Sequence, residues 1–184
     1  MPDTDVPVTA PRRRADAVRN AEAVLEAAKD AFAATGVDTP MRDIAARAGV
    51  GVGTIYRSYP QRSDLIIAVF RREVDATARA ADELAAQHPP AEALRHWADS
   101  FARFVATKRG LSGALHSGDP AYQPLPEYFL GTLAPRVQRM LDAGVADGTI
   151  RADVSAEDLI LALSRLAAAG GRMTGVLLDG LLRP

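Results

Sequence analysis

Apolar residues recur at spacings of three and four along most of the chain, which is the period of an α-helix with one buried face. Residues 15–35 show this pattern clearly, with an apolar stripe made of Val18, Ala21, Leu25, Ala28 and Phe32. Gly36 follows where a helix C-cap is expected. Strict alternation of apolar and polar positions, the mark of a half-buried strand, is not found in the 184 residues. The sequence therefore predicts an all-α protein.

Further helices are predicted over residues 40–47, 51–58, 91–110, 127–146 and 156–182, and a long helix is predicted to begin between Gln61 and Asp64 and to end before Pro89. Thr39 before Pro40 resembles an N-cap followed by proline at the first helical position. Pro135 predicts a kink or break near Leu133. The segment 110–126 is rich in Gly, Ser and Pro, which indicates a loop or short helical pieces.

Three alternate glycines, Gly49, Gly51 and Gly53, interrupt a stretch that otherwise suits a helix. Glycine inside a helix costs ~1 kcal/mol relative to alanine, so this spacing needs a reason. Two short helices joined by a turn that contains glycine form a helix-turn-helix, and Gly49 lies at that turn. Gly51 and Gly53 lie in the first turn of the second helix, where a missing side chain allows a DNA phosphate to approach the backbone amides. A nucleotide-binding glycine loop is rejected because a predicted helix, not a strand, precedes the glycines.

The segment TPMRDIAARAGVGVGTIYRSYPQRSDL, residues 39–65, resembles the DNA-binding domain of the TetR family of transcriptional regulators. The similarity extends from about residue 15 to residue 70. The resemblance implies contacts with the phosphate backbone from Thr54, Tyr56 and Arg62. It implies that the residues facing the major groove are Val52, Gly53 and Arg57. Thr39 is interpreted first as a cap and second as a residue near the DNA backbone.

Two positions depart from the family pattern. Ser58 replaces a residue that is often histidine, and Arg62 replaces one that is often lysine, so the positive charge is kept only at the second. Val52 and Gly53 have no side-chain hydrogen-bonding groups. Sequence specificity is therefore expected to depend on Arg57, on an apolar thymine contact and on DNA shape. We interpret Tyr59 as a core aromatic residue beneath the recognition helix.

The chain is expected to have three parts: a disordered basic arm over residues 1–14, a helix-turn-helix DNA-binding domain over 15–62, and a larger helical ligand-binding and dimerisation domain over 63–184. The arginines of the arm, Arg12 to Arg14, either reach a minor groove or form a solvated basic tail. Residues 10–62 hold nine Lys or Arg against six Asp or Glu, whereas the whole chain has a net charge of −1. Positive charge is thus concentrated at the predicted DNA-binding end.

Six of the ten aromatic residues lie between positions 97 and 129, which suggests either an apolar ligand cavity or a filled core. For a cavity, we predict contacts with a small-molecule effector from Trp97, Phe101, Phe104 and Tyr128. A neighbouring polar stripe would add His96, Ser100 and Arg103. His116 is a further candidate.

The last segment, 156–182, is apolar, and Gly170 and Gly171 are expected to divide it into two helices. Such a pair either closes the core of its own chain or packs against its copy as a four-helix bundle. The family resemblance favours a homodimer through these two C-terminal helices. Two recognition helices about 34 Å apart would then contact two half-sites of a palindrome.

The composition and the absence of known enzyme motifs limit the classes of function that the chain can have. The chain has no cysteine, and no hydrophobic run long enough to cross a membrane. No motif of a hydrolase, metalloprotease or phosphate loop is found, so we expect no enzyme activity, no metal and no cofactor. We predict a cytoplasmic, ligand-released homodimeric repressor that binds double-stranded operator DNA. The alternatives are a helical small-molecule-binding protein without sequence-specific DNA binding, and an activator or nucleoid-type DNA binder.

Overall fold

The computed structural model describes residues 10–168 and 172–183, and the prediction of an all-α fold is confirmed. The helices are α1 (Ala10–Thr35), α2 (Met41–Ala48), α3 (Val52–Ser58), α4 (Arg62–Gln87), α5 (Pro90–Gly110), α6 (Ser112–Leu115), η1 (Pro120–Tyr122), α7 (Leu125–Ala146), α8 (Ala156–Ala168) and α9 (Arg172–Leu181). Within the described residues, no helix is long and apolar enough to cross a membrane.

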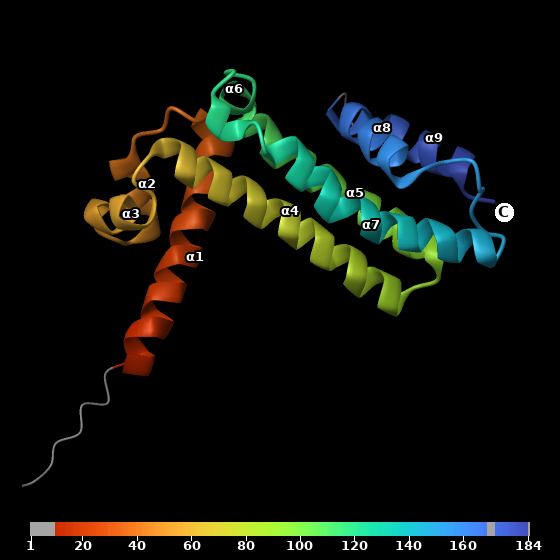
Figure 1. Cartoon of the computed structure of the whole chain (residues 1–184), viewed down its shortest axis with the longest axis horizontal. Helices are drawn as coiled ribbons and strands as arrows, with labels where there is room; N and C mark the ends of the chain where they lie inside the picture. Colours follow the sequence, from red (N-terminus) through yellow and green to blue (C-terminus); the bar gives the residue numbers. More distant parts are fainter. Residues whose placement is uncertain (1–9, 169–171, 184) are drawn as a thin grey trace, which may run out of the picture.

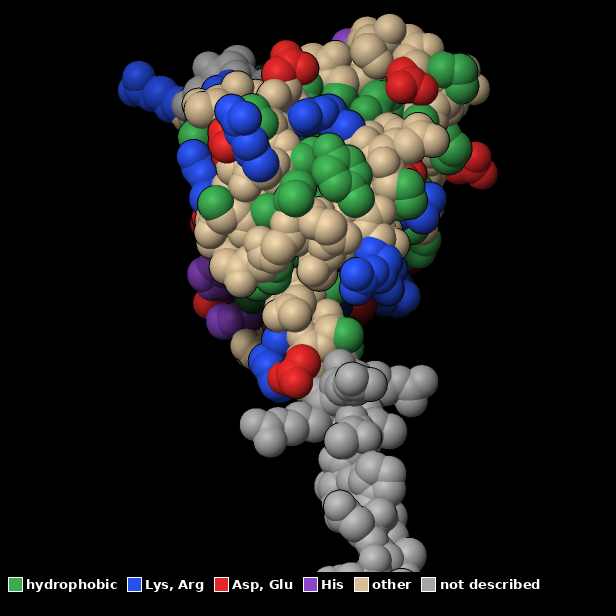
Figure 2. All heavy atoms as spheres, turned by 90° about the vertical axis from the view of Figure 1, so that its left-hand side faces the viewer, with side chains coloured by type: hydrophobic (Ala, Val, Ile, Leu, Met, Phe, Trp, Pro, Cys, Tyr) green, Lys and Arg blue, Asp and Glu red, His purple; other side chains and the backbone are tan. Residues whose placement is uncertain are grey.

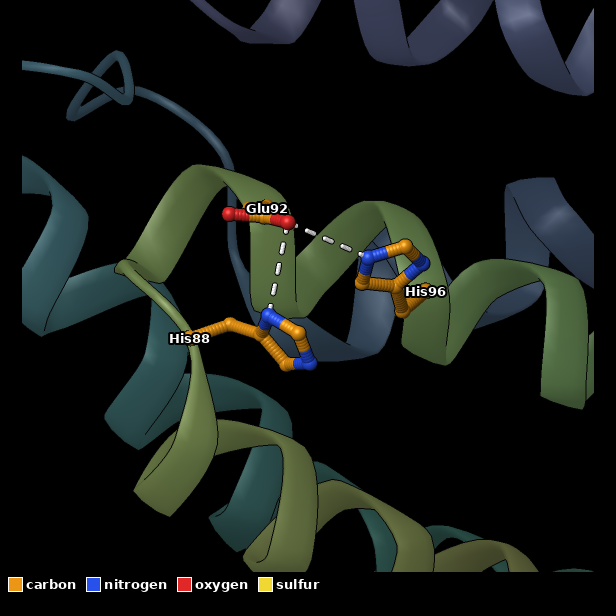
Figure 3. Close-up of side chains that lie close together, drawn as sticks. All are labelled: His88, Glu92 and His96. Carbon is orange, nitrogen blue, oxygen red and sulfur yellow. Dashed lines mark hydrogen bonds and ion pairs between the residues drawn. The ribbon is translucent and has the colours of Figure 1, made fainter.

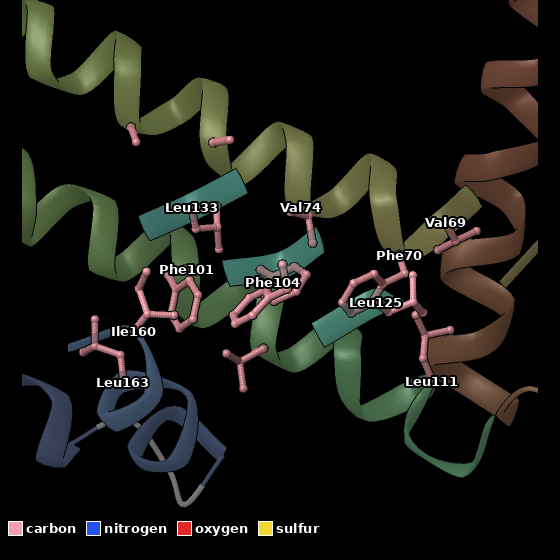
Figure 4. Packing of buried hydrophobic residues seen from close by; sticks show 14 of the residues in the cluster. Val69, Phe70, Val74, Phe101, Phe104, Leu111, Leu125, Leu133, Ile160 and Leu163 are labelled. Atoms are coloured by element: carbon pink, nitrogen blue, oxygen red, sulfur yellow. The ribbon is translucent and has the colours of Figure 1, made fainter. Parts of the chain in front are cut away.

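The helices form a small end and a larger body, joined by α4 (Figure 1). Helices α1, α2 and α3 lie at the small end, and α4 runs from there along the body beside α5 and α7. Helix α8 covers the opposite side of α5 and α7, and α9 packs against α8. Figure 4 shows the apolar interior between these layers, where the ring of Phe104 on α5 lies between those of Phe101 and the α4 residue Phe70. Burial of this continuous apolar core fixes the helices that the periodicity predicted.

Helix α1 is longer than predicted. It begins at Ala10, so residues 10–14, which were expected in a disordered arm, are helical. Residues 1–9 lie outside the described part of the chain. Gly170 and Gly171 also lie outside it, so the role of these two glycines in dividing the last segment into two helices stays a prediction. Gly36 follows the helix with a φ of +83°, as a C-cap glycine should.

The prediction that Thr39 caps the next helix is wrong. Pro40 occupies the N-cap position of α2. Thr39 is buried, its hydroxyl donates to the Gly36 carbonyl at 2.9 Å, and it lies 2.5 Å from the hydroxyl of Thr35. The turn after Gly36 directs Thr39 back onto the end of α1, because the Thr39 amide also bonds to the Gly36 carbonyl.

The break that Pro135 predicted does not occur, since α7 continues from Leu125 to Ala146 through the proline. A proline inside a helix costs about 3 kcal/mol. Burial of Phe129, Leu133 and Val137 on the inner face of α7 offsets that cost. Tertiary packing here outweighs a local preference. The segment 110–126 consists of short helical pieces and turns, as predicted.

Candidate nucleic-acid interface and effector cavity

Helices α2 and α3 form the predicted helix-turn-helix, with Gly49 at the end of α2. Gly49 has a φ of +68°, a left-handed conformation that glycine adopts without strain. The Val50 amide bonds back to the Ala45 carbonyl at 3.1 Å and closes the turn. Ile55, with 1% of its surface exposed, anchors α3 in the core. The orientation of α3 is therefore fixed by one buried side chain and one glycine turn.

The outer face of α3 presents the residues predicted to contact DNA. Val52 is 42% exposed and Tyr56 is 50% exposed, and Gly53 and Arg57 are exposed beside them. Thr54 is half-buried at the edge of this face. Figure 2 shows that basic side chains, with a few acidic ones among them, surround a small hydrophobic patch at this end of the molecule. Exposed apolar, aromatic and basic groups together suit contact with base edges and phosphates.

Gly51 and Gly53 are not required by packing. A β-carbon built at either position would meet no atom of the described chain within 4 Å, beyond the helix's own backbone and adjacent residues. Neither glycine has a positive φ. The missing side chains therefore serve no contact inside the described protein, which agrees with a role in close approach to an external partner.

Tyr59 packs partly buried against the core, as predicted for a residue beneath the recognition helix. Burial raises the pKa of its hydroxyl, although the positive charge of Arg72 acts in the opposite direction. Ser58, which replaces the histidine common in the family, is exposed on α3.

Two predicted DNA contacts have partners inside the protein. The guanidinium of Arg62 donates from Nη1 to the carbonyls of Val37 and Thr39, at 2.5 and 2.7 Å. Arg62 therefore ties the loop between α1 and α2 to the start of α4. Thr39 is buried with its hydroxyl in internal hydrogen bonds, so it does not present that hydroxyl to a phosphate.

A cavity of about 450 Å³ opens in the body, within the size range of small-molecule sites. Its wall is largely apolar, with four polar or charged side chains and one tyrosine among the lining residues. These are Phe70, Lys108, Leu115, His116, Tyr122, Leu125, Pro126, Phe129, Leu130, Leu161, Ser164 and Arg165.

The charged groups of the cavity are cationic. Burial lowers the pKa of the Lys108 ammonium, which lies 5.6 Å from the centre of the Phe129 ring. Arg165 contributes a second positive charge from α8. Burial and the nearby Asp119 raise the pKa of Tyr122, and the charge of Arg62 opposes that change. Tyr122 therefore lies within electrostatic range of the arginine that holds the α1–α2 loop.

The predicted effector contacts are mostly elsewhere among the described residues. Trp97 and Phe101 are fully buried, and the Trp97 indole donates to the Thr77 carbonyl at 3.2 Å. Phe104 is buried and stacks on Phe129, with ring centres 5.6 Å apart. These residues fill the core behind the cavity instead of lining it, because this face of α5 packs between α4 and α7.

The polar members of that prediction lie on outer surfaces. His96, Ser100 and Arg103 line a separate open hollow between α4 and α5. Tyr128 donates to a carboxylate oxygen of Asp75 at 2.6 Å, and this hydrogen bond is the main cause that raises its pKa. The prediction thus grouped residues from two places: aromatic residues of the buried core and polar residues of the open hollow.

Some residues that line the cavity were not predicted from the sequence as effector contacts. Lys108 follows Phe101 and Phe104 at helical spacings, and this placement of a cation on an apolar face was the signal available. Phe70 gave no such signal, since its spacing marks it only as core. Tyr122 and Phe129 belong to the aromatic group between 97 and 129, and His116 had been considered.

Two family models match the chain. The model described as "Bacterial regulatory proteins, tetR family" matches residues 24–69. The model described as "Transcriptional regulator SbtR-like, C-terminal domain" matches residues 89–183, about half of the chain. The first match contains α2 and α3, and the second contains most of the residues around the cavity.

Solved structures agree over nearly the full length. A TetR transcription regulatory protein from Mycobacterium vanbaalenii is 37% identical, with a TM-score of 0.73 over 92% of this chain and 99% of that one. The TetR transcriptional regulator SCO0520 from Streptomyces coelicolor is 33% identical, with a TM-score of 0.74 over 88% and 97% of the two chains. The HTH-type transcriptional regulator SAB2452 of Staphylococcus aureus is 36% identical over 63 residues, so the match spans about a third of that relative's length.

Proposed function

We propose that this chain, which belongs to the TetR family of transcriptional regulators, is a homodimeric repressor that binds a palindromic operator and leaves it when an effector binds. The family consists of DNA-binding regulators, not of enzymes. The exposed face of α3, held in a helix-turn-helix, is the observation that carries the proposal. We place this regulator in the cytoplasm, where its DNA target lies.

The DNA contacts fall into two classes. Arg57 and Val52 are proposed to contact base edges in the major groove, since a guanidinium bonds to guanine and an apolar side chain contacts the thymine methyl group. Thr54 and Tyr56 are proposed to bond to phosphates and fix the register. Gly53 allows the backbone to approach the DNA closely.

The dimer is proposed to form through α8 and α9. Met173 and Val176 on α9 are 53% and 58% exposed, and Leu161 on α8 is exposed as well. Large apolar side chains exposed on two adjacent helices indicate a surface that another apolar surface covers. A second copy of the same pair would form a four-helix bundle and would hold two copies of α3 for two half-sites.

The effector class follows from the cavity. An apolar wall with two cations, Lys108 and Arg165, suits an organic molecule with an apolar body and one acidic group. Such an anion would pair with Lys108 and compensate the burial that lowers its pKa.

Release is proposed as a population shift. The effector must bind more tightly to a state whose two recognition helices do not fit successive major grooves. Tyr122 in the cavity wall and the neighbouring Arg62 connect the effector to the α1–α2 loop. Displacement of Tyr122 would thereby be transmitted to the helix-turn-helix.

The test is fluorescence anisotropy of the full chain on DNA from upstream of its own gene, against scrambled DNA across a salt series. Specific binding should exceed binding to scrambled DNA at least about a thousandfold. Arg57→Ala should lose that discrimination, whereas Tyr56→Phe should weaken binding to both DNAs equally. Arg79→Ala, which removes an exposed arginine from α4 in the body, is the matched control and should bind as the wild type does.

Equal, weak binding to both DNAs, together with no enriched sequence in a selection from random DNA, would contradict the repressor. Effector binding with no DNA preference would then favour the small-molecule-binding protein. An activator would bind specifically but raise transcription from the same promoter in a reporter assay, so this assay separates the two modes of regulation.

A further inference from the structure

Two histidines, His88 just after the end of α4 and His96 on α5, point at the same carboxylate oxygen at the corner where α4 meets α5 (Figure 3). Nδ1 of His88 lies 3.3 Å from Oε1 of Glu92, and Nε2 of His96 lies 3.4 Å from that same atom. The three ligand atoms all lie within 4.8 Å of one another. A common surface ion pair on a helix uses one ring for one carboxylate, whereas this cluster gathers two rings on one oxygen.

The distances fit a tetrahedral metal ion. Bonds of about 2.0–2.1 Å from zinc to nitrogen or oxygen place neighbouring ligand atoms about 3.3 Å apart. Two of the three distances between ligand atoms, 3.3 and 3.4 Å from the histidine nitrogens to Oε1 of Glu92, already have that length. The third, between His88 and His96, is at most 4.8 Å and shortens by rotation of side chains that are exposed or partly exposed.

The backbone holds the three side chains in place. Glu92 and His96 lie one helical turn apart on one face of α5. His88 is the C-cap of α4, and its amide bonds to the Leu84 carbonyl at 3.0 Å. Pro89 and Pro90 follow at once and restrict the corner, because proline fixes φ. Metal binding would therefore need little backbone movement.

The cluster lies in a solvent-open hollow, and the acidic residues of that hollow stand outside the proposed set of ligands. The hollow that contains His88 and His96 is also lined by Glu83 and Asp99, against one cation, Arg103. The hollow is open, so water can complete the coordination as a fourth ligand. Imidazole nitrogen selects zinc, copper or nickel over magnesium and calcium, which prefer oxygen ligands.

We propose that His88, Glu92 and His96 form a site for one divalent ion of the zinc class, which fastens the end of α4 to the first turns of α5. The site is separate from the effector cavity and from α3, and the proposal depends on neither the operator nor the effector. The ion would stabilise the corner at which the helix that leaves the DNA-binding end turns back into the body.

The experiment is isothermal titration of the full, untagged, chelator-treated chain with Zn²⁺, with Mg²⁺ as the comparison ion. We expect one Zn²⁺ per chain with a micromolar or tighter dissociation constant and no saturable heat from Mg²⁺. His96→Ala and Glu92→Gln should each weaken Zn²⁺ binding at least tenfold. Glu83→Gln makes the same chemical change at an exposed glutamate of the same hollow and should keep the affinity within twofold.

Thermal unfolding gives a second readout. At about a hundredfold excess over the dissociation constant, Zn²⁺ should raise the Tm of the wild type by roughly 5–10 °C. The two cluster variants should show the wild-type Tm without Zn²⁺ and little rise with it. The absence of saturable Zn²⁺ binding below about 100 µM would overturn the proposal. Equal affinity in His96→Ala, or an equal loss in Glu83→Gln, would overturn it as well.

Discussion

Gly110, the last residue of α5, lies directly against the backbone of Phe32 in α1. A β-carbon at position 110 would lie 2.5 Å from the Phe32 carbonyl oxygen and 2.9 Å from the α-carbon of Ala33. Real β-carbons do not approach backbone atoms this closely, and backbone cannot move aside as a flexible side chain can. The contact joins the body to the DNA-binding end, and Gly110 lies two positions after Lys108, which is in the cavity wall.

Gly110→Ala is therefore expected to lower the free energy of unfolding by about 1–3 kcal/mol, as overpacking does, and to displace α1. Urea denaturation measures the first effect, and operator affinity reports the second. Gly131→Ala is the control, since a β-carbon there meets nothing within 4 Å outside its own helix and adjacent residues. The free energy of unfolding of Gly131→Ala should equal that of the wild type or exceed it by up to about 1 kcal/mol. Equal effects at both glycines would contradict the close contact.

Gly53→Ala should separate stability from DNA binding. A β-carbon at Gly53 meets nothing within 4 Å apart from its own helix and adjacent residues, so alanine should raise the free energy of unfolding by up to about 1 kcal/mol. The same methyl group should keep the backbone away from DNA and weaken operator binding at least tenfold in the anisotropy assay. A variant that is more stable and binds DNA as well as the wild type would show that the glycine has no role in approach.

Arg62→Gln should lower the stability of the fold. It removes charge-assisted hydrogen bonds to the carbonyls of Val37 and Thr39, which predicts a loss of about 1–3 kcal/mol in the free energy of unfolding. Arg57→Ala, at an exposed position, should change stability by less than about 0.5 kcal/mol. If Arg62→Gln instead lowers DNA affinity with unchanged stability, the arginine contacts phosphate and not the α1–α2 loop.

These residues show which parts of the site the sequence could predict. The helix-turn-helix was predictable because its signals are local: a glycine at the turn, an apolar residue at position 55, and exposed polar residues around it. The internal partners of Arg62 lie 23 and 25 residues away, and helical periodicity carries no information about such contacts. For the same reason the spacing of Trp97 could not decide between core and cavity, which depends on the helices that cover α5. His96 was noted in the sequence, but its pairing with His88 requires the corner at Pro89 and Pro90.

Lys108→Met should change the pH dependence of stability. Because burial lowers the folded-state pKa of Lys108, the unfolded chain holds its proton more tightly than the folded chain. The wild type should thus gain stability as pH rises through the lowered pKa towards the ordinary lysine range. Methionine has no such penalty, so the variant should be more stable at pH 7, by a margin that narrows at pH 10. Urea denaturation at both pH values measures this, and a constant margin would contradict the burial of the charge. An acidic effector should bind the variant at least tenfold more weakly.

Val176→Glu should test the dimer. Val176 is 58% exposed on α9, so the substitution leaves the core of a single chain intact. In a four-helix bundle between two copies, however, it would bury a charge without a partner, which is strongly unfavourable. Sedimentation velocity should show a dimer for the wild type and a monomer for the variant at micromolar concentration. Val145→Glu makes the same change at an exposed valine of α7 and should stay dimeric. Because one recognition helix contacts one half-site, the monomeric variant should also lose operator affinity. Without DNA, dilution should lower the thermal midpoint of the dimeric wild type, and it should lower that of the variant less. A variant that remains dimeric would place the interface away from α9.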